Sequence, residues 1–247
     1  MVSVFSDGFR CFFQGVQLAL SPALRPFVVV PLLINVLLFA ALSWWVAGEF
    51  SGWLDALLSF LPDWLAAISR GVLAVLLAVL LFLVMGISFL PVSNVLAAPF
   101  NGLLAERAQL LLAGVAPPPE NILALVSRSL ARELRKLLYF TPRTLGVLCA
   151  AFLLSWIPLL NIAAPLLTFV WGAWYMVLQY LDYCEDNQQR DFGSTLALVR
   201  GQRSGSLGFG AAVMLAASVP VLNWFVMPVA VCGAAGLWVQ LQRPTAG

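Results

Sequence analysis

Long apolar runs separated by short polar connectors dominate the chain and predict membrane-spanning helices. Residues 27–47 and 71–100 are apolar almost throughout. About twenty residues at about 1.5 Å each are enough to cross a hydrocarbon core of about 30 Å. Pro91 and Pro99 are expected to kink the second helix without ending it. The pattern therefore predicts two full transmembrane helices.

The N-terminal residues 1–21 follow a helical period with two unlike faces. Phe9 and Phe12 fall on an apolar face, and Arg10 and Gln14 fall on a polar one. A signal peptide would not show this alternation, whereas a helix lying in the membrane interface would. We expect an interfacial helix that stays on the mature protein.

A second amphipathic region, residues 101–140, follows the second span and is expected on the cytoplasmic side. Between residues 121 and 140, Arg128, Arg132 and Arg135 share one helical face and leucines occupy another. Together with Glu106 and Arg107, these arginines could form a pore mouth that gathers anions. The alternative is a basic helix that rests on acidic lipid headgroups.

Two related breaks interrupt the last apolar segments. "PLLN" at 158–161 and "PVLN" at 220–223 each place a proline and an asparagine within apolar sequence. The arm before each break holds fourteen residues, about 21 Å as a helix, which is shorter than a core of about 30 Å. We therefore predict two re-entrant helical hairpins, 144–181 and 206–241, whose tips lie within the membrane.

The asparagines of these breaks, Asn161 and Asn223, have two candidate roles. Each could stabilise backbone groups that the turn leaves unpaired, or contact a water-filled path. Six full spans remain an alternative, because the return arms 165–181 and 224–241 are long enough to cross. The charge pattern does not separate the two arrangements.

Charge along the connectors gives an orientation. The connector 49–70 carries Glu49, Asp55 and Asp63 against one arginine. The basic residues can all lie on the opposite side: Arg10, Arg25, Arg107, the cluster between 128 and 143, Arg190, Arg200, Arg203 and Arg243. By the positive-inside rule, both termini are cytoplasmic.

Composition supports an integral membrane protein and argues against several other classes. Of 247 residues, 62% are hydrophobic and 10% are charged, with a net charge of only +2. No broad basic field is available for nucleic acid. The chain has no histidine and its four cysteines are widely spaced, so we predict no catalytic residue, no metal site and no cofactor.

One acidic stretch, residues 180–191, is a candidate metal site. Asp182, Glu185 and Asp186 could in principle hold a divalent ion. A solvated loop where a helix leaves the membrane is the favoured interpretation. A membrane enzyme is accordingly the third hypothesis for this chain.

The segment "SPALRPF", residues 21–27, is the candidate anion site. Pro26 suits the first turn of a helix, so the amides of Leu24 and Arg25 would lie near a helix N-terminus. There, free donors and the helix dipole favour an anion, and the Arg25 guanidinium adds a forked contact. The alternative is that Arg25 binds a lipid phosphate.

Several long segments resemble the CysZ sulfate permeases of bacterial inner membranes, in order along nearly the whole chain. They are "LRPFVVVPLLIN", "LAAPFNGLLAE", "ARELRKLLYFTPR", "IPLLNIAAP", "QYLDYCEDN" and "SLGFGAAVMLAASVPVLNWFVMP". The resemblance implies sulfate uptake for assimilation into cysteine, through two long transmembrane helices and two hairpins that penetrate only part-way.

In that family the loop before the first span, typically Gly-Leu-Arg-Arg, looks like a sulfate site. Leu24 and Arg25 match it here, whereas Ala23 replaces the glycine and Pro26 the second arginine. We therefore assign sulfate to Ala23, Leu24 and Arg25, with one guanidinium instead of two.

The leading hypothesis is an all-α, single-domain membrane protein, residues 1–247, that passes sulfate by a channel-like or facilitated route. We expect a homo-oligomer within the lipid bilayer, with sulfite as a competitor. The candidate pathway residues are Glu106, Arg107, Arg128, Arg132, Arg135, Asn161 and Asn223. The main competitor is a non-transporting membrane scaffold that uses its half-length hairpins to dock a partner.

Overall fold

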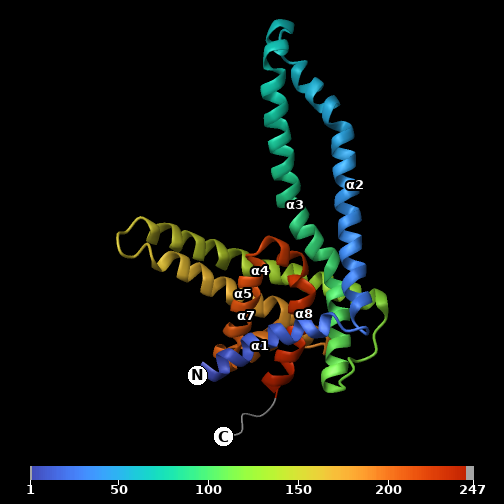
Figure 1. The fold of residues 1–247 in the computed structure, drawn as a ribbon, viewed down its shortest axis with the longest axis vertical. Helices are drawn as coiled ribbons and strands as arrows, with labels where there is room; N and C mark the ends of the chain where they lie inside the picture. Colours follow the sequence, from blue (N-terminus) through green and yellow to red (C-terminus); the bar gives the residue numbers. More distant parts are fainter. Residues whose placement is uncertain (1, 243–247) are drawn as a thin grey trace. The chain divides into compact units, whose positions relative to one another are not determined.

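Eight α-helices make up the fold of residues 2–242, the part that the computed structural model describes. The surroundings of the side chains at 2–3, 35, 86–98, 122, 220–221 and 224 are not included in that description. Arg243, which entered the charge pattern, lies outside the described residues. The helices are α1 Val2–Ala19, α2 Arg25–Leu58, α3 Asp63–Ala113, α4 Ile122–Ser155, α5 Ala163–Asn187, α6 Phe192–Gly201, α7 Arg203–Ala217 and α8 Pro220–Gln242 (Figure 1).

The chain divides into two compact units, and residues 29–97 form the smaller one. This unit is an antiparallel pair made by α2 and the first part of α3, joined by a short turn (Figure 1). Leu54, Leu58 and Leu77 are buried between its helices. An exposed ion pair joins Arg70 to Asp55 at 3.0 Å, so a small apolar cluster and one surface contact hold the pair near the turn.

The two predicted spans are confirmed as long apolar helices, but both extend beyond the predicted limits. The span predicted at 27–47 is part of a helix that continues to Leu58, and the helix containing the second span begins at Asp63. Helices Arg25–Leu58 and Asp63–Met85 are long and apolar enough to cross a membrane, and none of the most apolar window of either is buried. The apolar side chains of these helices therefore face outward, where they can contact lipid.

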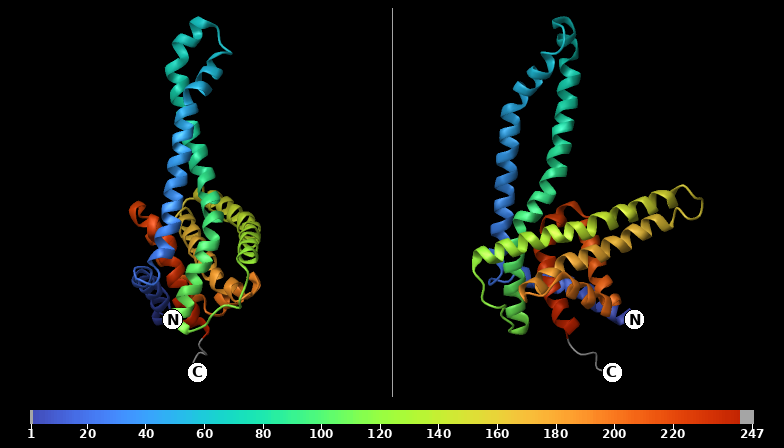
Figure 2. Two further views of the ribbon diagram at one scale, coloured as in Figure 1. Left: turned by 90° about the vertical axis from the view of Figure 1, so that its right-hand side faces the viewer. Right: turned by 180° about the vertical axis from the view of Figure 1, so that it is seen from behind.

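The larger unit holds residues 1–28 and 98–247. Its core lies where α1 packs on α7 and α8, and α5 packs on the same two helices (Figure 2). The predicted apolar face of α1 is only partly correct. Phe12 is buried and Phe9 packs partly buried against the core, whereas Phe5, which the same helical period puts on this face, is exposed.

Close helix approach in this core depends on glycine. A Cβ atom added at Gly8 would lie 1.8 Å from the carbonyl oxygen of Gly205, at the contact of α1 with α7. The bare backbones therefore touch directly, as small residues permit between membrane helices. Neither helix can give way without losing the contacts that surround it.

Gly8→Ala is therefore expected to lower the free energy of unfolding by about 2 kcal/mol or more, since a forced backbone shift adds to ordinary overpacking. Gly146→Ala is the matched control, because nothing lies within 4 Å of a Cβ atom added there, in the interior of α4. Alanine in that helix should be neutral or stabilising. Thermal unfolding of the detergent-solubilised proteins measures both changes, and equal midpoints for the two variants would contradict the close approach.

The first predicted hairpin is present as helices α4 and α5, which run side by side to a turn at residues 156–162 (Figure 2). The predicted boundary near residue 140 is wrong, because α4 continues unbroken through Pro142 and spans 34 residues. The argument from a fourteen-residue arm therefore does not hold for α4. Residues 123–155 and 225–242 are also long and apolar enough to cross a membrane, and how deeply either hairpin penetrates remains a prediction.

Candidate functional site

The segment that leads into α2 forms a tight turn whose amides are already paired. The carbonyl oxygen of Ser21 accepts hydrogen bonds from the amides of Leu24 (3.1 Å) and Arg25 (3.0 Å). The carbonyl oxygen of Leu24 accepts from Phe27 (3.0 Å) and Val28 (3.2 Å), and Pro26 has no amide hydrogen. The expectation of free amides at Leu24 and Arg25 is therefore wrong in this conformation.

Side chains, not amides, face outward from this turn. Leu24 is fully buried and anchors the turn in the core, whereas Ala23 and Arg25 are exposed. The Arg25 Nε donates to the carbonyl oxygen of Leu20 at 2.7 Å. This bond holds the stem in place and leaves the two terminal nitrogens with no protein partner among the described residues.

A second guanidinium lies beside the same turn. The Cζ atom of Arg107, on α3, lies over the ring of Phe27 at 5.7 Å from its centroid. Phe27 follows Arg25 by two residues, so two arginines that are far apart in the sequence flank the start of α2. The Oγ of Ser21 is buried and has no hydrogen-bond partner in the part of the chain that the structure describes. The turn therefore presents two cations and one unused hydroxyl.

Glu106 points elsewhere, although it is adjacent to Arg107 in sequence. It lines a cavity of about 500 Å³ together with Arg128, Asn187 and the Pro117–Pro119 stretch. A second cavity, of about 290 Å³, is lined by Arg128, Arg132, Arg135, Asp186 and Arg190, among others. Arg128 lines both cavities, and Glu106, Arg132 and Arg135 each line one of them.

The expectation of a solvated loop over residues 180–191 is wrong for three of its four carboxylates, whereas Asp191 is exposed. Asp182, Glu185 and Asp186 lie on α5 and are 1%, 1% and 5% exposed. Asp182 and Asp186 face Arg128, Arg132 and Lys136 on α4, which recur every four residues along one face. Glu185 instead accepts hydrogen bonds from Arg190 and from the Trp238 indole. We call Arg128, Arg132, Lys136, Asp182 and Asp186 the α4–α5 charge cluster.

Arg132 and Asp182 make the best-formed contact in this cluster. The Arg132 Nε and Nη2 donate to the two carboxylate oxygens of Asp182 at 2.8 and 2.6 Å. The Thr195 hydroxyl donates to Asp182 at 2.7 Å, and the Lys136 ammonium lies 3.6 Å away. Burial alone would raise the pKa of Asp182, but the bond from Arg132 and the charges of Lys136 and Arg132 hold that pKa below its ordinary value.

Asp186, four residues further along α5, is less well stabilised as a carboxylate than Asp182. Its Oδ1 lies 2.5 Å from Arg128 and 3.3 Å from Arg132, yet it makes no well-directed hydrogen bond within the described chain. Burial raises the pKa of this carboxyl more than the two arginines lower it. Arg128 is also held by Glu120, whose oxygens accept from it at 2.8 and 3.2 Å.

The basic face of α4 therefore contacts protein carboxylates, not lipid headgroups, at Arg128 and Arg132. Arg135 differs, since it is exposed. Leu123, Leu134 and Leu138 are exposed as well, so the outward surface of α4 is largely apolar. This corrects the prediction of a helix that rests on acidic headgroups through all three arginines.

Asn161 and Asn223 lie at the two hairpin turns and are exposed. The Asn161 amide donates to the carbonyl oxygen of Ile157, and that of Asn223 donates to the carbonyl oxygen of Val219. Neither side chain makes a hydrogen bond within residues 2–242. The predicted side-chain support of the turn backbone is therefore not seen, and contact with a water-filled path stays a prediction.

A metal centre has no structural support in the described part of the chain. No group of three or more histidine, cysteine, aspartate and glutamate side chains there could hold a metal ion. Asp182 and Asp186 contact cationic groups instead, as buried charges without a metal require. The membrane-enzyme hypothesis thereby loses the only feature on which it rested.

Comparison with known proteins adds sequence evidence to this geometry. Residues 11–228 match the family model described as Sulfate transporter CysZ/Etoposide-induced protein 2.4. A Sulfate transporter CysZ of Pseudomonas fluorescens is 42% identical over 231 residues, which are 92% of this chain and 90% of the relative. That of Salmonella typhimurium is 39% identical over 241 residues, 96% of this chain and 93% of the relative.

Proposed function

The chain belongs to the Sulfate transporter CysZ/Etoposide-induced protein 2.4 family, and from this premise we propose that it carries sulfate into the bacterial cytoplasm. The transport supplies sulfate assimilation and cysteine biosynthesis. Sulfate reaches the protein from outside the inner membrane and passes by a channel-like or facilitated route. A transport role fits a chain of which only 10% of residues are charged and which has cationic groups at the α2 turn and in the α4–α5 charge cluster.

The membrane arrangement that we propose has two full spans and two re-entrant hairpins, with both termini cytoplasmic. The exposed apolar surfaces of α2 and α3 support the two spans. At the turn between α4 and α5, Trp156, Leu159 and Ile162 are strongly exposed. A turn of this composition is unsuited to water and suited to the interior of a bilayer. Association of several copies would cover part of this apolar surface.

The observation that carries the substrate site is the pair of arginines at the start of α2. Arg25 and Arg107 flank the turn, and the Ser21 hydroxyl is buried there without a partner. A sulfate dianion accepts from guanidinium and hydroxyl donors without needing a proton of its own. Arg107 thus provides the second cation that Pro26 removes from the family's Gly-Leu-Arg-Arg loop.

From this turn the proposed pathway continues through the cavities that Arg128 lines. Glu106 lies in the first cavity, and Arg132 and Arg135 line the second. Sulfate would gain from the cations without binding too tightly, because carboxylates already neutralise Arg128 and Arg132. Asn161 and Asn223 remain candidates for the parts of the path nearest the hairpin tips.

Radiolabelled sulfate flux into proteoliposomes tests the proposal. Vesicles with the purified full chain should take up sulfate faster than empty vesicles of the same lipid. Sulfite should compete better than chloride, because it is also a divalent oxyanion. A parallel series with a pH gradient distinguishes coupled from passive flux. Uptake equal to that of empty vesicles would contradict the transport proposal and favour the non-transporting scaffold.

A further inference from the structure

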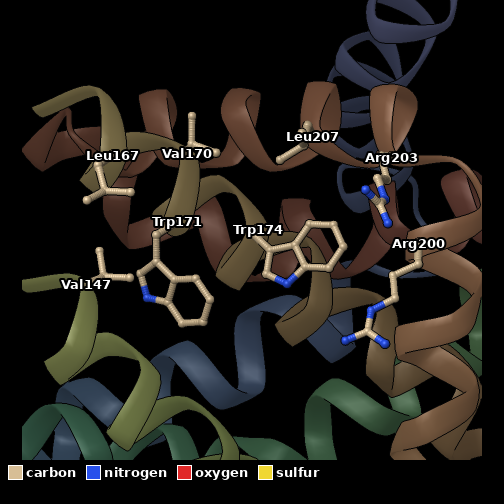
Figure 3. A pocket seen from close by; sticks show the side chains of 8 residues that line it. All are labelled: Val147, Leu167, Val170, Trp171, Trp174, Arg200, Arg203 and Leu207. Carbon is tan, nitrogen blue, oxygen red and sulfur yellow. The ribbon is translucent and has the colours of Figure 1, made fainter. Parts of the chain in front are cut away.

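A pocket of about 370 Å³ at the base of the α4–α5 hairpin is unrelated to the proposed sulfate pathway. Its walls come from α4, α5, α6 and α7, all within the larger unit. Figure 3 shows its two unlike ends, with apolar side chains at one and two guanidiniums at the other. The lining residues are Val147, Leu167, Val170, Trp171, Trp174, Arg200, Arg203 and Leu207.

The apolar end continues the outer surface of the hairpin. Val147, Leu167 and Val170 line it beside the Trp171 indole. The Trp171 Nε1 donates to the Thr144 hydroxyl at 3.0 Å, which fixes the ring as a wall. Leu166 and Val170 are exposed, so the apolar wall of the groove continues onto the outer surface of α5.

The charged end holds two arginines that the fold does not use. Arg200 lies in the last turn of α6, and Arg203 is the first residue of α7. Both are exposed, and neither guanidinium has a carboxylate or hydrogen-bond partner within residues 2–242. Trp174 lies between them and Trp171 (Figure 3). Two unpaired cations next to an indole and an apolar groove match a ligand with an anionic head and an apolar tail.

We propose that this pocket binds one anionic phospholipid, with its phosphate on Arg200 and Arg203 and an acyl chain along Leu167 and Val170. Charge complementarity selects the headgroup, because guanidinium groups bind phosphate oxygens in a fork. The apolar groove selects an amphiphile over a free ion. A pocket of about 370 Å³ is within the range of about 300–1,000 Å³ found for ligand sites.

In the re-entrant arrangement proposed above, the pocket lies at a depth in the bilayer that suits a phospholipid. Trp171 and Trp174 follow the first residue of α5, Ala163, by eight and eleven residues, which is about 12 and 17 Å of helix. Half of a hydrocarbon core is about 15 Å. A turn near the bilayer centre therefore puts both indoles at the interface, where tryptophan is enriched, and the arginines at headgroup level.

Native mass spectrometry of the detergent-solubilised full chain tests the site. Phosphatidylglycerol should bind more tightly than phosphatidylcholine of the same acyl chains. The double variant Arg200→Gln/Arg203→Gln should bind phosphatidylglycerol about 30-fold more weakly, because each basic side chain at an anionic surface contributes a factor of about five. Its affinity for phosphatidylcholine should not change.

Arg10→Gln/Arg70→Gln is the matched control, because it removes two exposed arginines outside the pocket. It should retain the affinity of the unmodified chain for phosphatidylglycerol, and circular dichroism confirms that both double variants are folded. Equal binding of the two lipids, or an equal loss in the two double variants, would overturn the proposal. So would displacement of the lipid by an equal concentration of glycerol 1-phosphate or sulfate, which would show a site for free anions. The readout is lipid binding, so it does not depend on whether the chain transports sulfate.

Discussion

Asp182→Asn is expected to lower the free energy of unfolding by about 3 kcal/mol, the low end of the cost of removing one partner of a buried ion pair, because the carboxylate that then remains for Arg132 is that of Asp186, at 3.3 Å. The side chain of Arg132 is only 12% exposed and loses two charge-assisted bonds to the carboxylate. Lys136, still more buried, keeps Glu133 at 2.6 Å and the ring of Tyr183, whose centroid lies 4.6 Å from the ammonium. Chemical unfolding of the purified protein, followed by circular dichroism, measures the loss.

Asp186→Asn is the matched control for this substitution, because it removes the same charge one helical turn along α5. Arg128 keeps Glu120, and Arg132 keeps Asp182. The change should stay within about 1 kcal/mol, the net value of an ordinary hydrogen bond, because burial already disfavours the charged form of Asp186. Equal losses for the two variants would contradict the assignment of Asp182 as the main anchor of Arg132.

The stability that Asp182→Asn loses should depend on pH in a defined direction. Asp182 has a folded pKa below its ordinary value of 3.8, so its stabilising contribution is fully present above about pH 4 and is lost as the pH falls through the folded pKa. The difference between the unmodified chain and Asp182→Asn should therefore shrink in acid. Asp186, whose folded pKa is raised above 3.8, acts in the opposite direction, because protonation stabilises the folded state around it.

Much of the fold follows from the sequence, because apolar periodicity reports directly on which surfaces avoid water. The runs at 27–47 and 71–100 predict long helices, and these are present within α2 and α3. Helix limits are less predictable. The amphipathic region was expected to end at residue 140 and the hairpin arm to begin at residue 144, yet one helix, α4, continues through both and through Pro142, since contacts with α5 compensate for one missing backbone bond.

The charge cluster could have been predicted in part. Arg128, Arg132 and Lys136 recur every four residues, as do Asp182 and Asp186, so each set occupies one face of a helix. When one arm of a helical hairpin carries cations and the other carries carboxylates at the same four-residue spacing, the two sets are expected to form ion pairs. The acidic set alone predicts solvated carboxylates, because several carboxylates are rarely buried without partners, and the partners lie at least fifty residues earlier in the chain.

The anion site was predictable for Arg25 but not for its surroundings. The sequence indicates a helix start with free amides, whereas the turn at Ser21 pairs them. No local pattern places Arg107 beside Phe27, because the two residues are eighty positions apart in the sequence. The side chains that a ligand meets are therefore set by tertiary structure, and the backbone pattern alone overstates the role of the amides.

Arg25→Gln and Arg107→Gln are each expected to weaken sulfate binding about 10- to 100-fold, the range for loss of a charge-assisted hydrogen bond. Both substitutions remove a guanidinium at the start of α2. Arg143→Gln is the matched control, since Arg143 is an exposed arginine that lies over Tyr139 and donates to its carbonyl oxygen. The sulfate-dependent rise of the unfolding midpoint measures affinity, because a ligand stabilises only the state that binds it.

The double variant decides whether the two arginines bind the same ion. If one sulfate contacts both, the single losses do not add, since removing either guanidinium already lets the ion shift toward the other. If Arg107 only packs over Phe27, Arg107→Gln changes the midpoint without sulfate but leaves the sulfate-dependent shift intact. Arg25→Lys separates charge from geometry, because an ammonium keeps the charge and loses the fork. Full sulfate affinity in Arg25→Gln would move the substrate site away from this turn, whatever the flux measurements give.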